Sequence, residues 1–399
     1  MTAENNLVEY VDYFRQLAVR HSDLRHNEAA ETGDAPASEM HFAKWNLNEI
    51  TGSLRTKLSF PAVLLELYEN QTAGSTIYNI KQRPKGALTI LQHVKEGSIR
   101  DEEAAYTLTE KILYDFLKQI WQDHYAPSAD RCETPFYQFD YNGLHITPTP
   151  KLFQNEMGWR VEFPFVFQNT IDIKRPPEAG TFIDYVVADY TNVAFATAYV
   201  DYFRQLAVSH YLLRHNQAAE TGDAPASQGH FTKWNANELV GGLRTKCSFP
   251  GMLLELYETD PYAETVYDVK PRSRGAFTIL QHVKEGDLRG EEAAYALAES
   301  IMYNILQQMW QDHYSSSKDR CKTPFYQFGF NNLDIVSTGK ILENEMGWRV
   351  EFYFEFQRAY NVMTPPDPGA FIDNEVFALG DDEGFLDADD LINTLLLTE

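Results

Sequence analysis

The chain reads NEMGWRVEFPFVFQ at 155–168 and NEMGWRVEFYFEFQ at 344–357, and this repeated stretch decides the fold. From Trp159 to Phe167 every second residue is aromatic or aliphatic, whereas Arg160 and Glu162 occupy positions between them. A period of two predicts a β-strand with one face in a core and the other face outward. The second occurrence keeps the same alternation, so the sequence predicts two equivalent strands.

The repetition extends outward from this stretch over most of the chain. YVDYFRQLAV begins at Tyr10 and again at Tyr199, and the other repeated segments are separated by the same 189 positions. About 110 of the 175 positions aligned at this offset are identical. A unit of this length is the size of a domain rather than of a solenoid repeat. We therefore predict a first repeat over 1–184, a connector over 185–198, a second repeat over 199–373 and an acidic tail over 374–399.

Within one repeat, the hydrophobic pattern predicts two helices and four strands. Leu7–Arg25 and Asp101–Tyr125 carry apolar residues at helical spacing, and the second has acidic residues in its first turn, where the helix dipole favours them. The predicted strands are Pro61–Glu69, Gly86–Val94, Pro135–Tyr141 and Gly158–Gln168. His41–Phe60 is ambiguous, and we interpret it as a short helix followed by a turn. This order predicts an α+β domain, an antiparallel sheet packed with helices on one face.

Composition narrows the class of protein. Asp and Glu number 58 against 34 Lys and Arg, a net charge of −24 that disfavours binding to a phosphate backbone. Three cysteines are too few for a disulfide framework and indicate a reducing compartment. The N-terminal MTAENNLVEY lacks the features of a signal peptide, and no segment is apolar enough to span a bilayer. We expect neither a membrane protein nor a secreted one.

Catalytic and metal-binding patterns are weak. Ten of the eleven histidines occur in pairs 189 positions apart, and none has the spacing of metal ligands. Asp123 and His124 precede Cys132, and Cys321 follows the same pair in the second repeat, so a Cys/His hydrolase is an open alternative. No glycine-rich elbow or phosphate-binding loop accompanies these residues. We expect no enzyme activity, no cofactor and no metal.

Two features suggest contacts with partners. Lys44 and Arg55 recur as Lys233 and Arg244, and in so acidic a chain these cations either contact an acidic surface on a neighbouring subunit or are solvated.

The predicted tail carries eight acidic residues and no basic one, yet it ends in an apolar run. One helical face of this run would present Leu391, Ile392, Leu395 and Leu396. We predict a short amphipathic helix that docks in a groove of this protein or of a partner.

The order of elements, with its PAVLLELYE strand, long amphipathic helix and closing GWRVEFPFVFQ strand, resembles the tail-terminator and tail-completion proteins of tailed bacteriophages. This resemblance implies an α+β fold and assembly into a ring at the head–tail junction, with a virion location after assembly in the host cytoplasm. Our first hypothesis is thus a structural protein of a phage or phage-like particle. The alternatives are a cytoplasmic protein-binding module and the Cys/His hydrolase.

Overall fold

The structure is a computed structural model of the chain. It describes residues 6–45, 58–73, 81–96, 98–125, 134–152, 155–168, 172–190, 193–234, 247–263, 269–284, 287–314, 323–341 and 344–356. The predicted tail over 374–399 lies outside the described residues.

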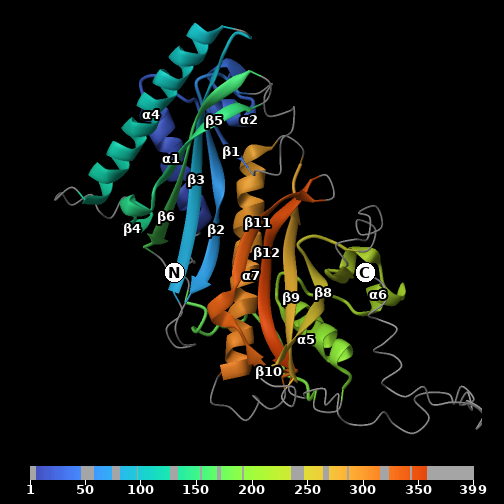
Figure 1. The fold of residues 1–399 in the computed structure, drawn as a ribbon. Coiled ribbons are helices and arrows are strands. Elements are labelled where there is room, and N and C mark those ends of the chain that lie inside the picture. Colours follow the sequence, from blue (N-terminus) through green and yellow to red (C-terminus); the bar gives the residue numbers. More distant parts are fainter. Residues whose placement is uncertain are drawn as a thin grey trace, which may run out of the picture. The chain divides into compact units, whose positions relative to one another are not determined.

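The elements of the first repeat recur in the same order in the second repeat (Figure 1). The first repeat contains α1 (Asn6–Arg20), α2 (Ala29–Thr32), β1 (Phe42–Trp45), β2 (Ala62–Ala73), β3 (Lys81–His93), α4 (Ile99–Tyr125), β4 (Phe136–Phe139), β5 (His145–Leu152) and β6 (Glu156–Phe167). The second contains α5 (Phe195–Ser209), α6 (Ala218–Thr221), β7 (Phe231–Trp234), β8 (Gly251–Ala263), β9 (Val269–His282), α7 (Leu288–Tyr314), β10 (Phe325–Phe328), β11 (Asp334–Ile341) and β12 (Glu345–Phe356).

The predicted α+β class is confirmed, and each predicted helix and strand of the first repeat is present. Two strands were not predicted. One is β5, and the other is β1, at the start of the 41–60 segment for which we predict a short helix and a turn. Residues 46–57 of that segment lie outside the described residues, so the short helix stays a prediction. The antiparallel sheet also has two parallel exceptions, because β1 runs parallel to β2 and β7 runs parallel to β8.

The twelve strands form one sheet that runs through both repeats, in the order β4-β6-β3-β2-β11-β12-β9-β8-β7. Three further pairings complete it: β1 with β2, β5 with β6 and β10 with β12. The repeats meet where β2 pairs with β11, with Asn70 opposite Ile335 and Gln71 opposite Asp334. The sheet is therefore shared between the repeats rather than closed within each.

The helices of the first repeat pack on the face of β6 that the alternation predicts to be buried. Trp159 donates its indole N–H to the Tyr106 carbonyl of α4 at 3.2 Å. Phe165 stacks on Tyr10 of α1, with ring centroids 5.4 Å apart. One hydrophobic core contains these aromatic layers and their counterparts from the second repeat, and Tyr68 of β2 contacts Trp348 of β12 inside it.

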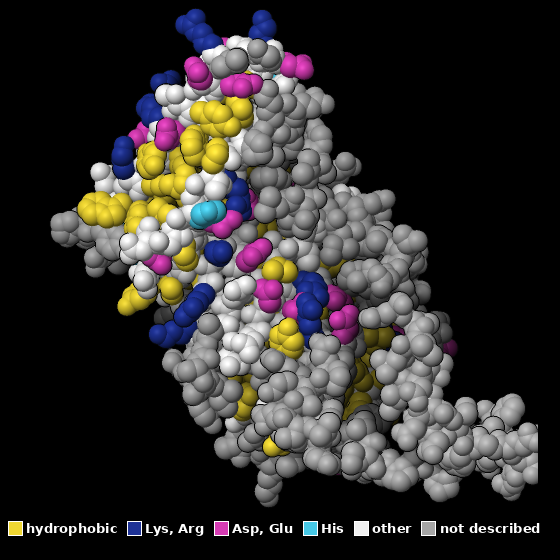
Figure 2. All heavy atoms as spheres, in the orientation of Figure 1, with side chains coloured by type: hydrophobic (Ala, Val, Ile, Leu, Met, Phe, Trp, Pro, Cys, Tyr) yellow, Lys and Arg dark blue, Asp and Glu magenta, His cyan; other side chains and the backbone are white. Residues whose placement is uncertain are grey.

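The opposite face of the sheet is charged. In the first repeat Arg160 forms a bidentate ion pair with Glu66, at 2.6 and 2.8 Å, and in the second Arg349 pairs with Glu255 in the same way. Figure 2 shows Lys and Arg side chains beside Asp and Glu side chains where β11, β12 and β9 lie. The ion pairs therefore lie on the face away from the main core, and at one end of this face a smaller apolar cluster buries Leu64 and Leu91 of β2 and β3.

Residues 172–190, which lead from the first repeat to the second, pack on α5 and α7. Ile183 donates its backbone N–H to Ser209, and Tyr211 donates to Thr181. Gln307 and Gln311 of α7 donate to backbone carbonyls of the same segment. The segment buries His210, because Phe182 packs edge-on against its ring at 5.2 Å.

Candidate functional site

A cluster of charged side chains lies where the first repeat contacts the N-terminus of α7. Five side chains of the first repeat belong to it, and we call this set the inner site: Asp12 and Arg15 of α1, Glu28 and Glu31 at α2, and Lys44 of β1. Arg15, Glu31 and Lys44 are buried, whereas Asp12 and Glu28 are partly exposed. Arg15 lies on the helix face that also carries the buried residues Val11 and Ala18, so the core-facing pattern of α1 itself places a cation inside.

Arg15 joins the two repeats directly. Its guanidinium is fully buried and donates to Glu31 at 2.8 Å, to Asp12, and to Glu292 near the N-terminus of α7. Burial by itself would lower the pKa of Arg15, but Glu292 and Glu31 outweigh it, so its pKa is raised. The guanidinium is therefore held charged by carboxylates from both repeats.

Lys44 binds the same end of α7. Its ammonium donates to the Leu288 carbonyl at 2.6 Å and lies 3.7 Å from Glu291 and 3.9 Å from Glu292. Burial lowers the pKa of Lys44, and the two carboxylates offset part of this effect. Burial likewise raises the pKa of Glu292, against the opposing influence of Lys44 and Arg15. The attraction between these opposite charges offsets the free-energy cost of removing them from water. Each buried charge is therefore stable only while its partners are present.

The α7 side adds one cation to the network. Arg289 lies 2.9 Å from Glu28, 3.4 Å from Glu31 and 3.7 Å from Asp12. Ion pairs of both polarities therefore cross the contact. Arg15 and Lys44 of the first repeat pair with carboxylates of α7, and Arg289 of α7 pairs with carboxylates of the first repeat.

The contact continues along β2 to the pairing with β11. Tyr68 donates its hydroxyl to Glu299, and Asn70 donates to the hydroxyl of Tyr303 at 2.9 Å. Burial raises the pKa of Glu299 to about 7. Thr72 closes the interface, since its hydroxyl donates to the Phe330 carbonyl and its backbone N–H donates to the Leu333 carbonyl.

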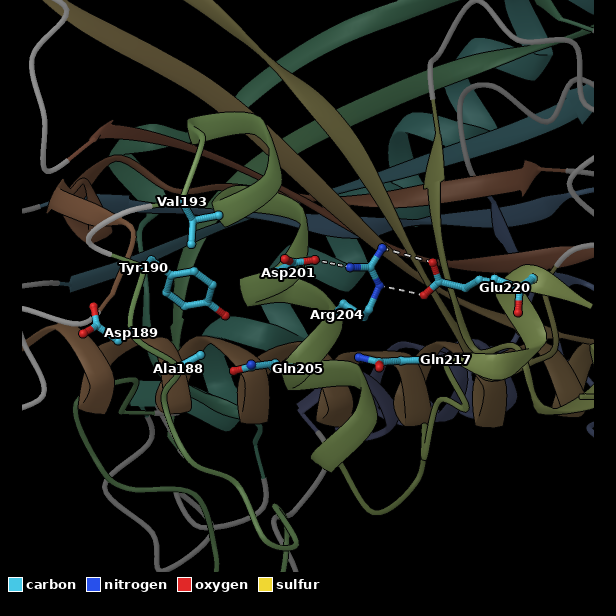
Figure 3. Close-up of a pocket in the computed structure, with 10 residues that line it drawn as sticks. Ala188, Asp189, Tyr190, Val193, Asp201, Arg204, Gln205, Gln217 and Glu220 are labelled. Carbon is cyan, nitrogen blue, oxygen red and sulfur yellow. Dashed lines mark hydrogen bonds and ion pairs between the residues drawn. The ribbon is translucent and has the colours of Figure 1, made fainter. Parts of the chain in front are cut away.

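The second repeat carries an equivalent set of residues that α7 does not occupy. We call it the outer site: Asp201, Arg204, Gln217, Glu220 and Lys233, each 189 positions after a member of the inner site. The first four line a surface pocket of about 430 Å³ (Figure 3).

In that pocket Arg204 donates to Glu220 through two nitrogens, at 2.7 and 3.0 Å, and to Asp201. The Nη2 atom of Arg15 donates to Glu292 of α7, whereas the equivalent Nη2 atom of Arg204 donates to Glu220 of its own repeat. Lys233 is exposed, whereas Lys44 is buried.

The predicted site residues fall into two groups. Lys44 and Lys233 lie in the inner and outer sites. Arg55 and Arg244, the four apolar tail residues, and Cys132 and Cys321 lie outside the described residues. Arg15, Arg289 and Glu292 were not predicted as contact residues. A signal for Arg15 was present, because it is a cation on the apolar face of α1.

The described residues contain no group of three or more His, Cys, Asp or Glu side chains arranged to hold a metal ion. The described cysteine, Cys247, is buried, and burial raises the pKa of its thiol to about 12, so it is a poor nucleophile. None of the helices in the described ranges combines the length and apolarity needed to cross a membrane.

Comparisons with known proteins add no relative: no family model, no curated protein and no solved structure matches this chain.

Proposed function

We propose that this chain is a structural protein of a phage or phage-like particle that self-assembles into a ring at the head–tail junction or in the tail. In this proposal it has no catalytic role, its two repeats are duplicated α+β domains, and its partners are copies of itself and other virion proteins. The acidic tail over 374–399 docks on a neighbour through Leu391, Ile392, Leu395 and Leu396.

The observation that carries the proposal is the contact between the repeats. A sheet that continues from one repeat into the next, sealed by a buried ion-pair network, is an assembly interface built into a single chain. A ring of similar domains needs the same contact many times, and a fused pair supplies it once per chain. The resemblance in element order to tail-terminator proteins supports the location.

The test is the composition of the particle. Particles purified from cells that produce this chain should contain it at a fixed, small copy number, and deletion of its gene should leave particles without joined heads and tails. A chain absent from purified particles would overturn the proposal. As a control for the hydrolase alternative, Cys132→Ala combined with Cys321→Ala should leave particle yield unchanged.

A further inference from the structure

We propose that chains join head to tail by repeating the contact that joins the two repeats: the N-terminus of α4 in one chain docks in the outer site of the next. The occupant of the outer site is thus a second copy of this chain. This inference deepens the proposed function and rests on its claim that the chain assembles with itself.

The charges required for the repeated contact are present on both surfaces. Asp201, Arg204, Glu220 and Lys233 are identical to their counterparts in the inner site, and Arg100, Glu102 and Glu103 of α4 are identical to Arg289, Glu291 and Glu292 of α7. One position differs, since Gln217 replaces Glu28. The chain-to-chain network would therefore keep its three cations and have one carboxylate fewer.

Residues at the inner contact are buried, whereas their counterparts on the two surfaces proposed to meet are exposed, as expected for surfaces whose neighbour is absent. On the helix, Tyr303 is 3% exposed under the first repeat, whereas its counterpart Tyr114 on α4 is 44% exposed. On the strand, Leu67 of β2 is 7% exposed and its counterpart Leu256 of β8 is 52% exposed. Figure 2 shows hydrophobic side chains gathered over the region of α4 and β6. Docking of a second chain would cover these surfaces as the inner contact covers theirs.

Both strands needed to continue the sheet have an edge that pairs with no other strand among the described residues. β5 pairs with β6 alone, and the C-terminal half of β8 pairs with β9 alone. By the register of the inner contact, Ile146 of one chain lies opposite Thr259 of the next. Pro148 of β5 lies beyond the short stretch that would pair, so its missing N–H does not prevent the pairing.

The chain-to-chain contact should be weaker than the inner one. Thr72, which makes three hydrogen bonds across the inner contact, is replaced by Pro261, which has neither a hydroxyl nor an N–H. Because the contact joins two different surfaces, it generates a closed ring or an open filament and not a two-fold dimer. The closed form is the one that the proposed function requires.

Sedimentation velocity on the full-length chain with two charge reversals tests the inference. Lys233→Glu damages the outer site, and Glu103→Lys damages the α4 end; both positions are exposed, so each variant should fold. Each alone should raise the apparent dissociation constant of assembly at least about tenfold. Lys85→Glu, an exposed cation on the charged face of the sheet, is the matched control and should assemble as the unmodified chain does.

An equimolar mixture of the two variants should associate again, because the intact α4 of one variant meets the intact outer site of the other. This rescue requires that the α4 end of one chain contact the outer site of another. If both variants assemble with unchanged affinity, the inference is overturned while the proposed function stands. If the unmodified chain stays monomeric both in solution and within its particle, the inference and the ring of the proposed function are both overturned.

Discussion

Lys44 and Lys233 occupy equivalent positions in the two repeats, but Lys44 is buried and Lys233 is exposed. Replacing each in turn by methionine measures how much the ammonium contributes to stability in the two environments. The strand FAKW contains the first and FTKW contains the second, so local sequence differs at one position. Lys44→Met keeps the length of the side chain and removes its ammonium. Glu291 and Glu292 then lose a cation at 3.7 and 3.9 Å, and the Leu288 carbonyl loses a hydrogen bond.

Breaking a buried ion pair by removing one partner costs about 3–5 kcal/mol, and Arg15 and Arg289 remain to neutralise part of the charge, so we expect about 3 kcal/mol for Lys44→Met. Lys233→Met should change stability by less than about 0.5 kcal/mol, because its side chain is exposed. Urea unfolding, followed by circular dichroism at concentrations where the chain is monomeric, measures both values. Equal losses of stability in the two variants would refute the asymmetry on which the inner and outer sites are defined.

Three further predictions concern pH and the tail. Glu299 has a pKa near 7, above its ordinary value of 4.5, so the folded chain holds an extra proton between these pH values and loses about 3 kcal/mol as pH rises through them. Glu299→Gln should remove that loss when the free energy of unfolding is measured from pH 5 to 8. An unchanged dependence of this free energy on pH in the variant would contradict the prediction. Burial lowers the pKa of His210 to about 4, so the free energy of unfolding should fall as pH drops from 6.5 towards 4, and His210→Gln should abolish about 3 kcal/mol of this dependence. Deletion of Asp387–Glu399 should leave the melting temperature unchanged and should weaken the association of chains measured by light scattering. Truncated chains that associate with undiminished affinity would contradict this prediction.

Much of the fold follows from local periodicity. The helices around Phe14 and Phe116 and the strand through Phe163 were predictable because burial on one face imposes a period that the sequence carries. β1 has only four residues, and β5 contains Pro148 and Pro150, so neither has a hydrophobic alternation of its own. Their strand conformation comes from neighbours in the sheet.

The joining of the two repeats had no local signal. The pairing of β2 with β11 connects residues more than 250 positions apart, and no short window of sequence encodes it. Lys44 and Lys233 were predicted as equivalent contact residues, and identical sequence cannot indicate which of the two is buried. The contact between the repeats makes them different, because Lys44 binds α7 whereas Lys233 is exposed.

The most direct test of the account is a cryo-electron microscopy reconstruction of the assembled full-length chain. We predict a ring in which the sheet continues from chain to chain, with Glu103 of one chain beside Arg204 and Lys233 of the next. A two-fold dimer, or an assembly whose outer sites are open to solvent, would contradict it.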